Sequence, residues 1–584
     1  MKSKHYISIS CVILTFTATA QNVDRNITVE REYKPVIQDA GKITSVPAVT
    51  DADTEKAPAK YNDFYFPMTI GPNVYPLQAA DLQLEKRRTP AQGFARIGLG
   101  NYMNTLVDFA TPIINSGDMR LDTKIDHLGT FGTKKLATTN AALIFNNFYK
   151  NAELFAGVKV GHEYFNYYGN NFDASGNVAN LNSFTTDKTT LYTEQNLTTI
   201  SRNATDYSLE KIRTAPLDNV FLRLNANIGF RSTPDKVGLR YEAQVKYNRF
   251  DSKNGLNEDI IHTIGKLNTE NGKNRMGIDF DLQNILYSSN LPATEINVLD
   301  TYAVFAMNPY YSFERSAWNV RLGVKSSFSF VQGRAFSPSP DLRAEWRAIP
   351  RWLAFYGGAD GGYKVNTLDV SAYENRYLFA DLRIKDTYTP LKSFVGIKFK
   401  PAYNVLVDAY LSYQYIDNQY FFTNKDYKTS TPILPNESDI YTNRFNVEYS
   451  AAQLTNLGLR ANYNIRNTVN VQWKAAYNGW ETRSAQHAWL QPKFETDLSA
   501  ELRINRNLQL SSNIFYVGER FAKLGNQAVS MKPYTDVNVG ASYSYSNWFT
   551  VFAKVNNLLN ANYANFYGYD VQRINGLVGA SFSF

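Results

Sequence analysis

The sequence predicts an all-β fold, a transmembrane antiparallel β-barrel. Three observations predict it: a secretion signal at the N-terminus, side chains that alternate with a period of two from about residue 93 onward, and an aromatic content of 14% at a mean hydropathy of −0.37. Strands that are apolar on one face only combine many aromatics with low mean hydropathy, because lipid contacts one face of the wall and the lumen the other.

Residues 1–20 have the order of a cleavable signal peptide. Lys2 and Lys4 precede an apolar stretch that reaches Phe16, and small residues follow up to Ala20. This stretch is too short to cross a bilayer as a helix, and no later window holds some twenty apolar residues. The only cysteine, Cys11, lies within the signal, so we expect no thiol or disulfide chemistry in the mature protein.

Residues 21–92 differ from the rest of the chain. Seven prolines punctuate mixed charges there, and no sustained alternation is present. This composition predicts an N-terminal periplasmic segment that is partly extended. The predicted organisation is therefore signal peptide (1–20), periplasmic segment (21–92) and barrel (93–584).

The barrel region alternates most clearly over 239–248, 494–505 and 537–546, where apolar and polar side chains take turns. Short turn signals occur at 115–118, 149–151, 233–235, 271–273, 315–316, 350–351, 401–404, 466–467, 505–507 and 546–547. Longer polar stretches separate them, at 170–217, 367–386, 417–442, 479–490, 517–532 and 557–569. Ten short turns and two free ends predict about 22 strands, within a range of about 16 to 22, with both ends of the barrel in the periplasm.

Aromatic side chains crowd at the predicted strand ends, over 164–168, 310–313 and 419–422. This placement is typical of the aromatic girdles at the two membrane interfaces. Within the predicted loop at 417–442, Tyr420, Phe421 and Phe422 are also candidates for ligand contact, because aromatic rings stack on sugars and fill protein interfaces. A girdle role explains the same three residues without a ligand.

The C-terminal part, about residues 440–584, resembles the barrel of TonB-dependent outer-membrane receptors. The resemblance rests on 549–560, on Tyr563, on Tyr567-Gly568-Tyr569 and on the last strand at 576–584. It implies a 22-stranded barrel in the outer membrane of a Gram-negative bacterium. The chain departs from the family in one respect, because 21–92 is too short for the globular plug that precedes the barrel in these receptors.

The same resemblance suggests a contact for a TonB-type coupling protein. Ile27, Thr28 and Val29 lie in a β-prone pentad near the mature N-terminus, where the family places the strand that pairs with TonB. An ordinary extended segment would look the same. At the other end, Phe582 and Phe584 share one face of the last strand, and an aromatic terminus resembles the signal that the barrel-assembly machinery recognises.

The sequence shows no signature of an enzyme, and we expect no cofactor, no metal site and no nucleic-acid partner. His127, His162, His262 and His487 lack partners at metal-ligand spacing. The formal charge of +8 is not concentrated in a basic run. Acidic residues of the barrel fall on the polar face, where they line a wet lumen.

Two functional hypotheses remain open. The first is a receptor-like or transporter-like barrel for solute uptake or passage, its lumen occluded by the N-terminal segment. The second is a non-transporting barrel that acts as a scaffold or accessory subunit of an outer-membrane complex, with 21–92 as the arm for a periplasmic partner. Outer-membrane lipid and the assembly machinery are expected partners in both.

Overall fold

A computed structural model describes residues 93–172, 178, 216–233, 238–289, 300–379, 382, 384–427, 440–466 and 468–584. The predicted signal peptide, the segment 21–92 and the residues Ile27, Thr28 and Val29 lie outside this part of the chain. No helix in the described part is both long enough and apolar enough to cross a membrane.

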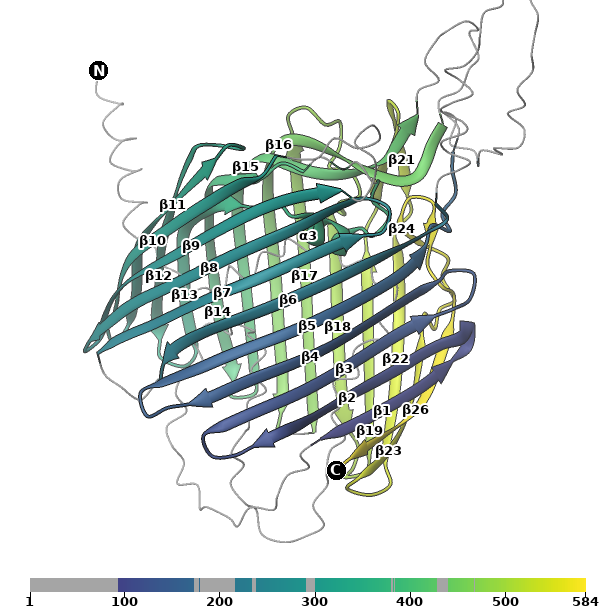
Figure 1. The fold of residues 1–584 in the computed structure, drawn as a ribbon. Helices are drawn as coiled ribbons and strands as arrows, with labels where there is room; N and C mark the ends of the chain where they lie inside the picture. The colour runs from purple at the N-terminus through teal and green to yellow at the C-terminus, as the bar shows by residue number, and fades with distance from the viewer. Residues whose placement is uncertain are drawn as a thin grey trace, which may run out of the picture.

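A single sheet of 22 antiparallel strands forms the wall (Figure 1). Its first half consists of β1 (Phe94–Gly100), β2 (Asn104–Asn115), β3 (Met119–Thr130), β4 (Leu136–Phe148), β5 (Ala152–Asn166), β6 (Asp218–Ser232), β7 (Leu239–Ser252), β8 (Leu256–Asn271), β9 (Asn274–Ser289), β10 (Tyr302–Glu314) and β11 (Trp318–Phe330). Its second half consists of β12 (Phe336–Ile349), β13 (Leu353–Lys364), β14 (Thr387–Ala402), β15 (Val405–Tyr427), β16 (Ile440–Ile465), β17 (Val469–Thr482), β18 (Phe494–Arg503), β19 (Leu508–Val517), β22 (Tyr534–Ser544), β23 (Phe549–Asn556) and β26 (Asn575–Ser583).

Six small elements of the described chain lie outside the wall. They are the 3-10 turn η2 (Asn101–Met103), the helix α3 (Leu368–Glu374), the hairpin of β20 (Arg520–Leu524) and β21 (Gln527–Met531), and the short pair of β24 (Ala564–Phe566) and β25 (Tyr569–Asp570). All of them follow a strand at the same end of the barrel, so they belong to its connections.

The barrel closes where the first strand meets the last. Strand β1 pairs with β26 from Phe94↔Ser583 to Gly100↔Leu577. Beyond β26, the Phe584 amide donates to the Gly93 carbonyl at 2.9 Å, and the Gly93 amide donates back at 2.8 Å. Closure leaves no strand edge in the wall, which is the condition for a sheet to exist in hydrocarbon. The predicted fold class and strand number are confirmed.

The two ends of the barrel differ, and we name them by their connections. Ten short turns lie at the end that also carries Gly93 and Phe584, which we call the turn end; it is the lower end in Figure 1. Each of the ten turns predicted from the sequence falls between two consecutive strands of this end. The other end, the loop end, carries longer connections, among them 167–217, 365–386 and 557–574.

Stacked aromatic rings mark the edges of an apolar belt on the outer surface. Near the turn end, Trp318, Trp346 and Phe355 stack across β11–β13 with 5.8 Å between successive ring centroids. Near the loop end, Phe305 and Phe328 stack at 6.3 Å. On β11 these two stacks contain Trp318 and Phe328, which are ten residues apart. This separation corresponds to about 33 Å along the strand. A strand tilt of about 40° reduces this to about 25 Å along the barrel axis, the height of the lipid-facing band of outer-membrane barrels.

The inner face of the wall is polar, and its charges are paired. Arg343 on β12 lies 3.1 Å from Asp341 and 3.0 Å from Asp360, and it is completely buried between them. Arg321 on β11 contacts Asp341 at 2.9 Å, and Lys325 contacts Asp360. Buried charges persist when they are paired and hydrogen-bonded, so the alternation of the sequence separates a charged inner surface from the apolar belt.

Candidate functional site

The loop end is closed by connections that fold inward and pack on one another. One cluster of buried side chains joins five of these connections to the upper wall; its members are Leu136, Phe165, Tyr167, Phe221, Phe250, Leu256, Leu368, Ala372, Tyr377, Leu382, Ile384, Tyr420, Phe422, Phe445, Leu490, Ala522, Met531, Phe566 and Tyr569. We call this closure the roof. It is the largest departure of the described chain from a plain cylinder, and it is therefore the candidate functional site.

The connection 365–386 carries the centre of the roof into the lumen. Thr367 caps α3 by accepting a hydrogen bond from the Val370 amide at 3.1 Å. The Leu368 amide donates to Glu258 of β8 at 2.7 Å. Ile261, three positions further along β8, is exposed on the outer face. Residues three positions apart on a strand lie on opposite faces, so the side chain of Glu258 projects into the lumen. The helix therefore lies on the lumen side of β8, at the mouth of the barrel.

An ionic cluster fastens this connection to the inner wall. Glu163 of β5 contacts Arg223 of β6 at 2.7 Å and Arg376 of the connection at 3.1 Å. Arg223 also contacts Asp369 of α3 at 2.6 Å. Two guanidinium groups and two carboxylates balance each other in a region that is largely removed from water, and the geometry holds α3 against two adjacent strands.

Aromatic stacking joins the connections to one another. The rings of Tyr377 and Tyr569 lie parallel with centroids 3.6 Å apart, and Tyr168 meets Tyr569 edge-on at 5.0 Å. These three residues come from three different connections. Burial raises the pKa of both Tyr168 and Tyr569 well above the usual range of a phenol, so both remain neutral at any physiological pH.

Backbone contacts complete the roof. The Tyr569 hydroxyl donates to the carbonyl of Asn443 at 2.6 Å, and the Asn443 side chain donates to the carbonyls of Tyr167 and Gly169 at 3.2 and 3.0 Å. Arg520 of β20 donates to two carbonyls of the β24 region. These carbonyl groups thus find partners within the roof, as buried backbone groups require.

A single carboxyl closes the base of the connection 365–386. Asp386 accepts hydrogen bonds from Tyr302 at 2.9 Å, from Tyr363 at 2.8 Å and from the Asn366 amide at 3.1 Å. The first and last parts of the connection are thereby held together beside β10 and β13. Burial raises the pKa of Asp386 above its ordinary value, although the three donors oppose this shift.

The ligand candidates Tyr420, Phe421 and Phe422 are placed differently from the expectation. They lie within β15 and not in a loop, because β15 and β16 run past their neighbours and bend over the mouth (Figure 1). Their exposed fractions are 8%, 1% and 8%. Tyr420 and Phe422 belong to the roof cluster, while Phe421 packs on the opposite face against Trp489. Their role in ligand contact stays a prediction, and direct contact would require the roof to open.

The expectation of girdle aromatics at 164–168 also needs correction. Phe165 is fully buried and Tyr167 is nearly so, and both rings pack inward in the roof. Alternation continues through the end of β5, so the odd-numbered aromatic side chains follow Glu163 into the lumen and do not face lipid. By contrast, Tyr311 on β10 is partly exposed on the outer face.

The assembly-signal residues lie on the outer face of the closing strand. Phe584 is 58% exposed and stacks on Phe109 of β2 at 6.3 Å, while Phe582 contacts Trp548 at 6.3 Å. Their recognition by the assembly machinery stays a prediction. In the described part of the chain no three His, Cys, Asp or Glu side chains converge as metal ligands. His262 instead contacts Asp281 at 2.5 Å, and His127 lies between two threonines.

Most residues of the roof carry no motif in the sequence, as is the case for Glu163, Arg223 and Arg376. Tyr377 falls in the predicted polar stretch 367–386. Tyr569 ends the stretch 557–569 and is one of the residues that carry the family resemblance, but the resemblance does not indicate that its ring packs in the roof. One signal was available: Glu163 and Arg223 both fall on the inward face near strand ends, where a buried charge needs a partner. That signal predicts that another segment packs against the inner wall at these strand ends, but it does not identify this segment as the connection 365–386.

Comparison with solved structures gives the same architecture. The chain is similar to the ferric-catecholate import receptor Fiu from E. coli K12, with a TM-score of 0.57 and 10% identity over 86% of this chain and 83% of that one. It is similar to the siderophore receptor PirA from Acinetobacter baumannii, with a TM-score of 0.58 and 10% identity over 86% and 81%. It is also similar to the iron transporter FrpB from Neisseria meningitidis, with a TM-score of 0.58 and 10% identity over 85% and 83%.

The barrel has the fold of TonB-dependent receptors. The resemblance found in the C-terminal part of the sequence therefore extends, at the level of fold, over the receptor-type barrel as a whole. No protein-family model matches the chain, and a search of curated proteins also finds no match. At 10% identity the receptor fold alone is shared, and no binding residue is carried over.

Proposed function

We propose that this chain is an outer-membrane barrel of the receptor and transporter type that takes up a solute through a lumen gated by the roof. One observation carries the proposal: a 22-stranded barrel with a charged inner wall is closed at its loop end by side-chain packing and ion pairs. Contacts of this kind can separate and re-form, whereas the hydrogen-bonded wall cannot open without exposing strand edges to lipid.

The barrel lies in the outer membrane of a Gram-negative cell with its loop end outside. Bacterial barrels place short turns and both chain ends in the periplasm and longer loops at the cell surface. The turn end here carries the ten short turns together with Gly93 and Phe584. A solute thus meets the roof first, and the wall begins at Gly93 on the periplasmic side.

The receptor fold supports two partners. A TonB-type coupling protein pairs with the segment around Ile27, Thr28 and Val29 through edge-strand hydrogen bonds. The barrel-assembly machinery recognises the closing strand with Phe582 and Phe584. The named structural neighbours are receptors and transporters, in agreement with the expectation that the chain is not an enzyme.

Conductance in a planar bilayer tests this function directly. We expect the full-length protein to conduct poorly. Deletion of residues 21–60, or opening of the roof, should raise conductance or abolish solute uptake in cells. Deletion of residues 26–30 alone is the matched test of coupling, and it should reduce uptake without changing conductance. Unchanged conductance together with unchanged uptake in all three variants would exclude the gated-receptor function.

A second function is favoured by how firmly the roof is built. Ion pairs, stacked rings and backbone hydrogen bonds all cross the mouth, and a permanently closed barrel suits a scaffold in an outer-membrane complex. Affinity purification with and without residues 21–92 separates the two. Loss of a stoichiometric partner on deletion supports the scaffold, while recovery of a lone barrel that conducts supports the receptor.

A further inference from the structure

The short turns of the turn end carry an excess of positive charge. Among their described residues there is one anion, Asp118, and there are six cations: Lys150, Lys273, Arg315, Arg351, Arg466 and Arg506. All seven are exposed. Because the turn end lies on the periplasmic side, these charges are at the level of the head groups of the periplasmic leaflet. In the outer membrane that leaflet consists of phospholipids.

Two of the six cations come from neighbouring turns. Arg315 lies between β10 and β11, and Arg351 lies between β12 and β13. The Arg347 amide of β12 donates to the Ala317 carbonyl of the first turn at 2.8 Å. Two strand spacings, about 10 Å, separate the two turns. Both arginine side chains can therefore reach one ligand of moderate size.

The guanidinium of Arg315 lies on the outer side of the wall. It is 5.6 Å from the centre of the Phe313 ring, and Phe313 shares the outer face of β10 with the exposed Tyr311. The adjacent carboxylate, Glu314, projects to the opposite face and contacts Arg347 at 2.5 Å. Arg315 is thus placed toward lipid, while Glu314 is placed toward the lumen.

Arg351 occupies a backbone conformation that favours glycine. Its φ is 70°, in the left-handed region, and Arg466 in a later turn has a φ of 45°. Turn geometry alone therefore does not explain an arginine at position 351. A strained residue at an exposed site indicates that its side chain has a role, and the role must lie in what the guanidinium meets at the membrane surface.

An apolar shelf lies on the outer face beside the two arginines. Its inner part is the stack of Trp318, Trp346 and Phe355, all three of which are exposed. Ile349 and Trp352, both 53% exposed, extend this surface to the turn. Indole rings at the edge of the apolar belt contact the glycerol region of a lipid and the first carbons of its acyl chains.

We propose that Arg315, Arg351 and this shelf bind one lipid of the cardiolipin class in the periplasmic leaflet. One phosphate accepts hydrogen bonds from Arg315 and the other from Arg351, and acyl chains lie against the shelf. The inference rests on the proposed orientation of the barrel, with its turn end in the periplasm, and does not depend on transport or on gating by the roof.

Charge complementarity selects this head group among phospholipids. Cardiolipin has two phosphates joined by one glycerol, so each guanidinium meets one phosphate and two positive charges balance two negative charges. Phosphatidylglycerol has a single phosphate and leaves one arginine without a phosphate. Phosphatidylethanolamine is neutral overall, and its ammonium group is repelled by the second guanidinium. Retention should therefore fall in that order.

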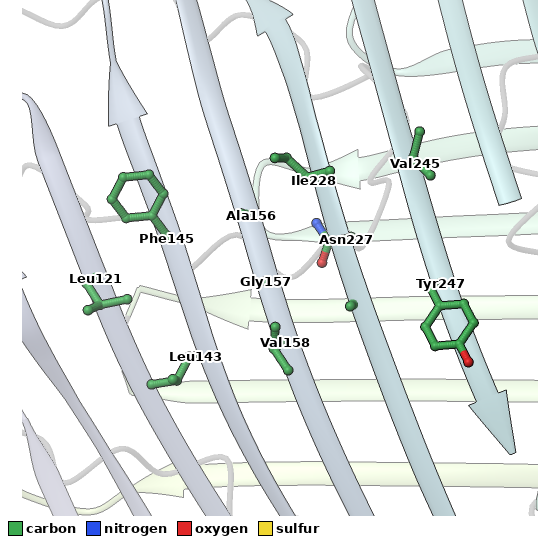
Figure 2. Close-up of a pocket in the computed structure, with 11 residues that line it drawn as sticks. Leu121, Leu143, Phe145, Ala156, Gly157, Val158, Asn227, Ile228, Val245 and Tyr247 are labelled. Carbon is green, nitrogen blue, oxygen red and sulfur yellow. The ribbon is translucent and has the colours of Figure 1, made fainter. Parts of the chain in front are cut away.

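Another apolar part of the outer wall provides a comparison. Strands β3 to β7 carry a hollow of about 340 Å³ that is lined almost entirely by carbon. Figure 2 shows Leu143, Val158 and Val245 among its lining residues, with Ala156 between the larger side chains. A surface of this kind accepts acyl chains without selecting a head group. It therefore serves as a control surface on the same molecule.

Native mass spectrometry of the full-length protein tests the proposal. The protein is purified in detergent and presented with cardiolipin, phosphatidylglycerol or phosphatidylethanolamine of equal chain length. We expect one retained cardiolipin per chain, at least about tenfold over phosphatidylethanolamine. Equal retention of all three lipids would show that the turn end does not select a head group, and the proposal would be wrong.

Two variants locate the site. The double change Arg315→Gln and Arg351→Gln should reduce cardiolipin retention to the level of phosphatidylethanolamine. Arg351→Gly should reduce it to the level of phosphatidylglycerol, although glycine adopts a φ of 70° without strain and does not weaken the fold. The heat-dependent shift of the barrel on gels verifies that each variant is folded. Cardiolipin that stays bound after both arginines are replaced would place the lipid elsewhere and overturn the site.

Two control variants separate a site from general attraction. Lys150→Gln with Arg506→Gln removes the same charge from other turns of the same end, and Ala156→Leu fills the hollow on β3 to β7. Both should leave cardiolipin retention unchanged. An equal loss in the two charge variants would show that only the total charge matters, and it would contradict the site. Failure of solute uptake or conductance in any variant tests the gated-receptor function, which this measurement in detergent does not involve.

Discussion

The turn end and the loop end of this barrel are built from the same 22 strands by different physical means. At the turn end, ten connections of a few residues join neighbouring strands, and nothing beyond local turn geometry is needed to hold them. At the loop end, residues hundreds of positions apart in sequence, such as Tyr168 and Tyr569, meet in one buried cluster. Local chemistry therefore determines one end, and tertiary packing determines the other.

This difference predicts where substitutions have large effects. Exposed aromatic residues in the short turns of the turn end should tolerate replacement, whereas buried residues of the roof should not.

The largest effect is expected for Tyr569→Ala. The change removes the ring that stacks on Tyr377 at 3.6 Å and the hydroxyl that holds Asn443. Truncating a buried aromatic residue costs about 3–5 kcal/mol. We expect a lower thermal midpoint and faster tryptic cleavage at Arg376. Tyr545→Ala at the turn end, where the side chain is 75% exposed, is the control, and an equal loss in both variants would refute the contrast.

A somewhat smaller effect is expected for Glu163→Gln. The change leaves Arg223 and Arg376 without their shared carboxylate, and breaking a buried ion pair costs about 3 kcal/mol. Higher conductance and faster cleavage in the connection 365–386 would report the opened roof. Glu242→Gln, which breaks a more exposed pair with Lys266, should cost at most about 1 kcal/mol. If the two variants behave alike, the ion cluster does not fasten the roof.

Removal of Phe584 is expected to have an effect at the turn end, because this residue takes part in closure of the barrel. The truncation deletes two backbone hydrogen bonds to Gly93 and the stacking on Phe109. We expect a several-fold lower amount of barrel in the outer membrane, measured by immunoblot of membrane fractions. Phe584→Tyr keeps the ring and the backbone and should restore the wild-type amount. Wild-type levels of the truncated chain would contradict the assembly role.

The smallest effect concerns pH. Because burial raises the pKa of Asp386 above its ordinary value, the folded roof binds this proton more tightly than the open chain does. Its contribution to stability is complete below the ordinary pKa, about 3.9 for an aspartate, and is lost as pH rises through the raised pKa, by at most about 1.4 kcal/mol per pH unit. The thermal midpoint should therefore fall across this window in the wild type. In Asp386→Asn the slope should be absent, and an unchanged slope would assign it to another group.

The wall could be predicted from the sequence because its information is local. Alternation places Phe494, Thr496 and Leu498 on one face whatever the rest of the chain does, and turn residues such as Asn271-Gly272 mark where strands reverse. The strand number followed from the turns alone. Closure then followed from lipid, which permits no free strand edge.

The roof could not be predicted because its contacts are between distant connections. The sequence showed that Tyr420 and Phe422 are aromatic and near a strand end, but alternation alone does not show that β15 and β16 continue past the rim and bend inward. The same side chains fit a girdle, a loop or a buried cluster equally well. Only the positions of Tyr377 and Phe566, which come from two other connections, and of Phe445 on the bent part of β16 decide among these.

The pairing of β1 with β26 sets the order in which this molecule can be made. The signal peptide predicted at residues 1–20 would direct export from the N-terminus, so β1 would reach the periplasm early and have no partner on one side until the last nine-residue strand arrives. During that interval a seven-residue edge is open to any passing strand. The last strand must therefore arrive before the cylinder exists, and a chain that ends before β26 leaves the edges of β1 and β23 without a partner.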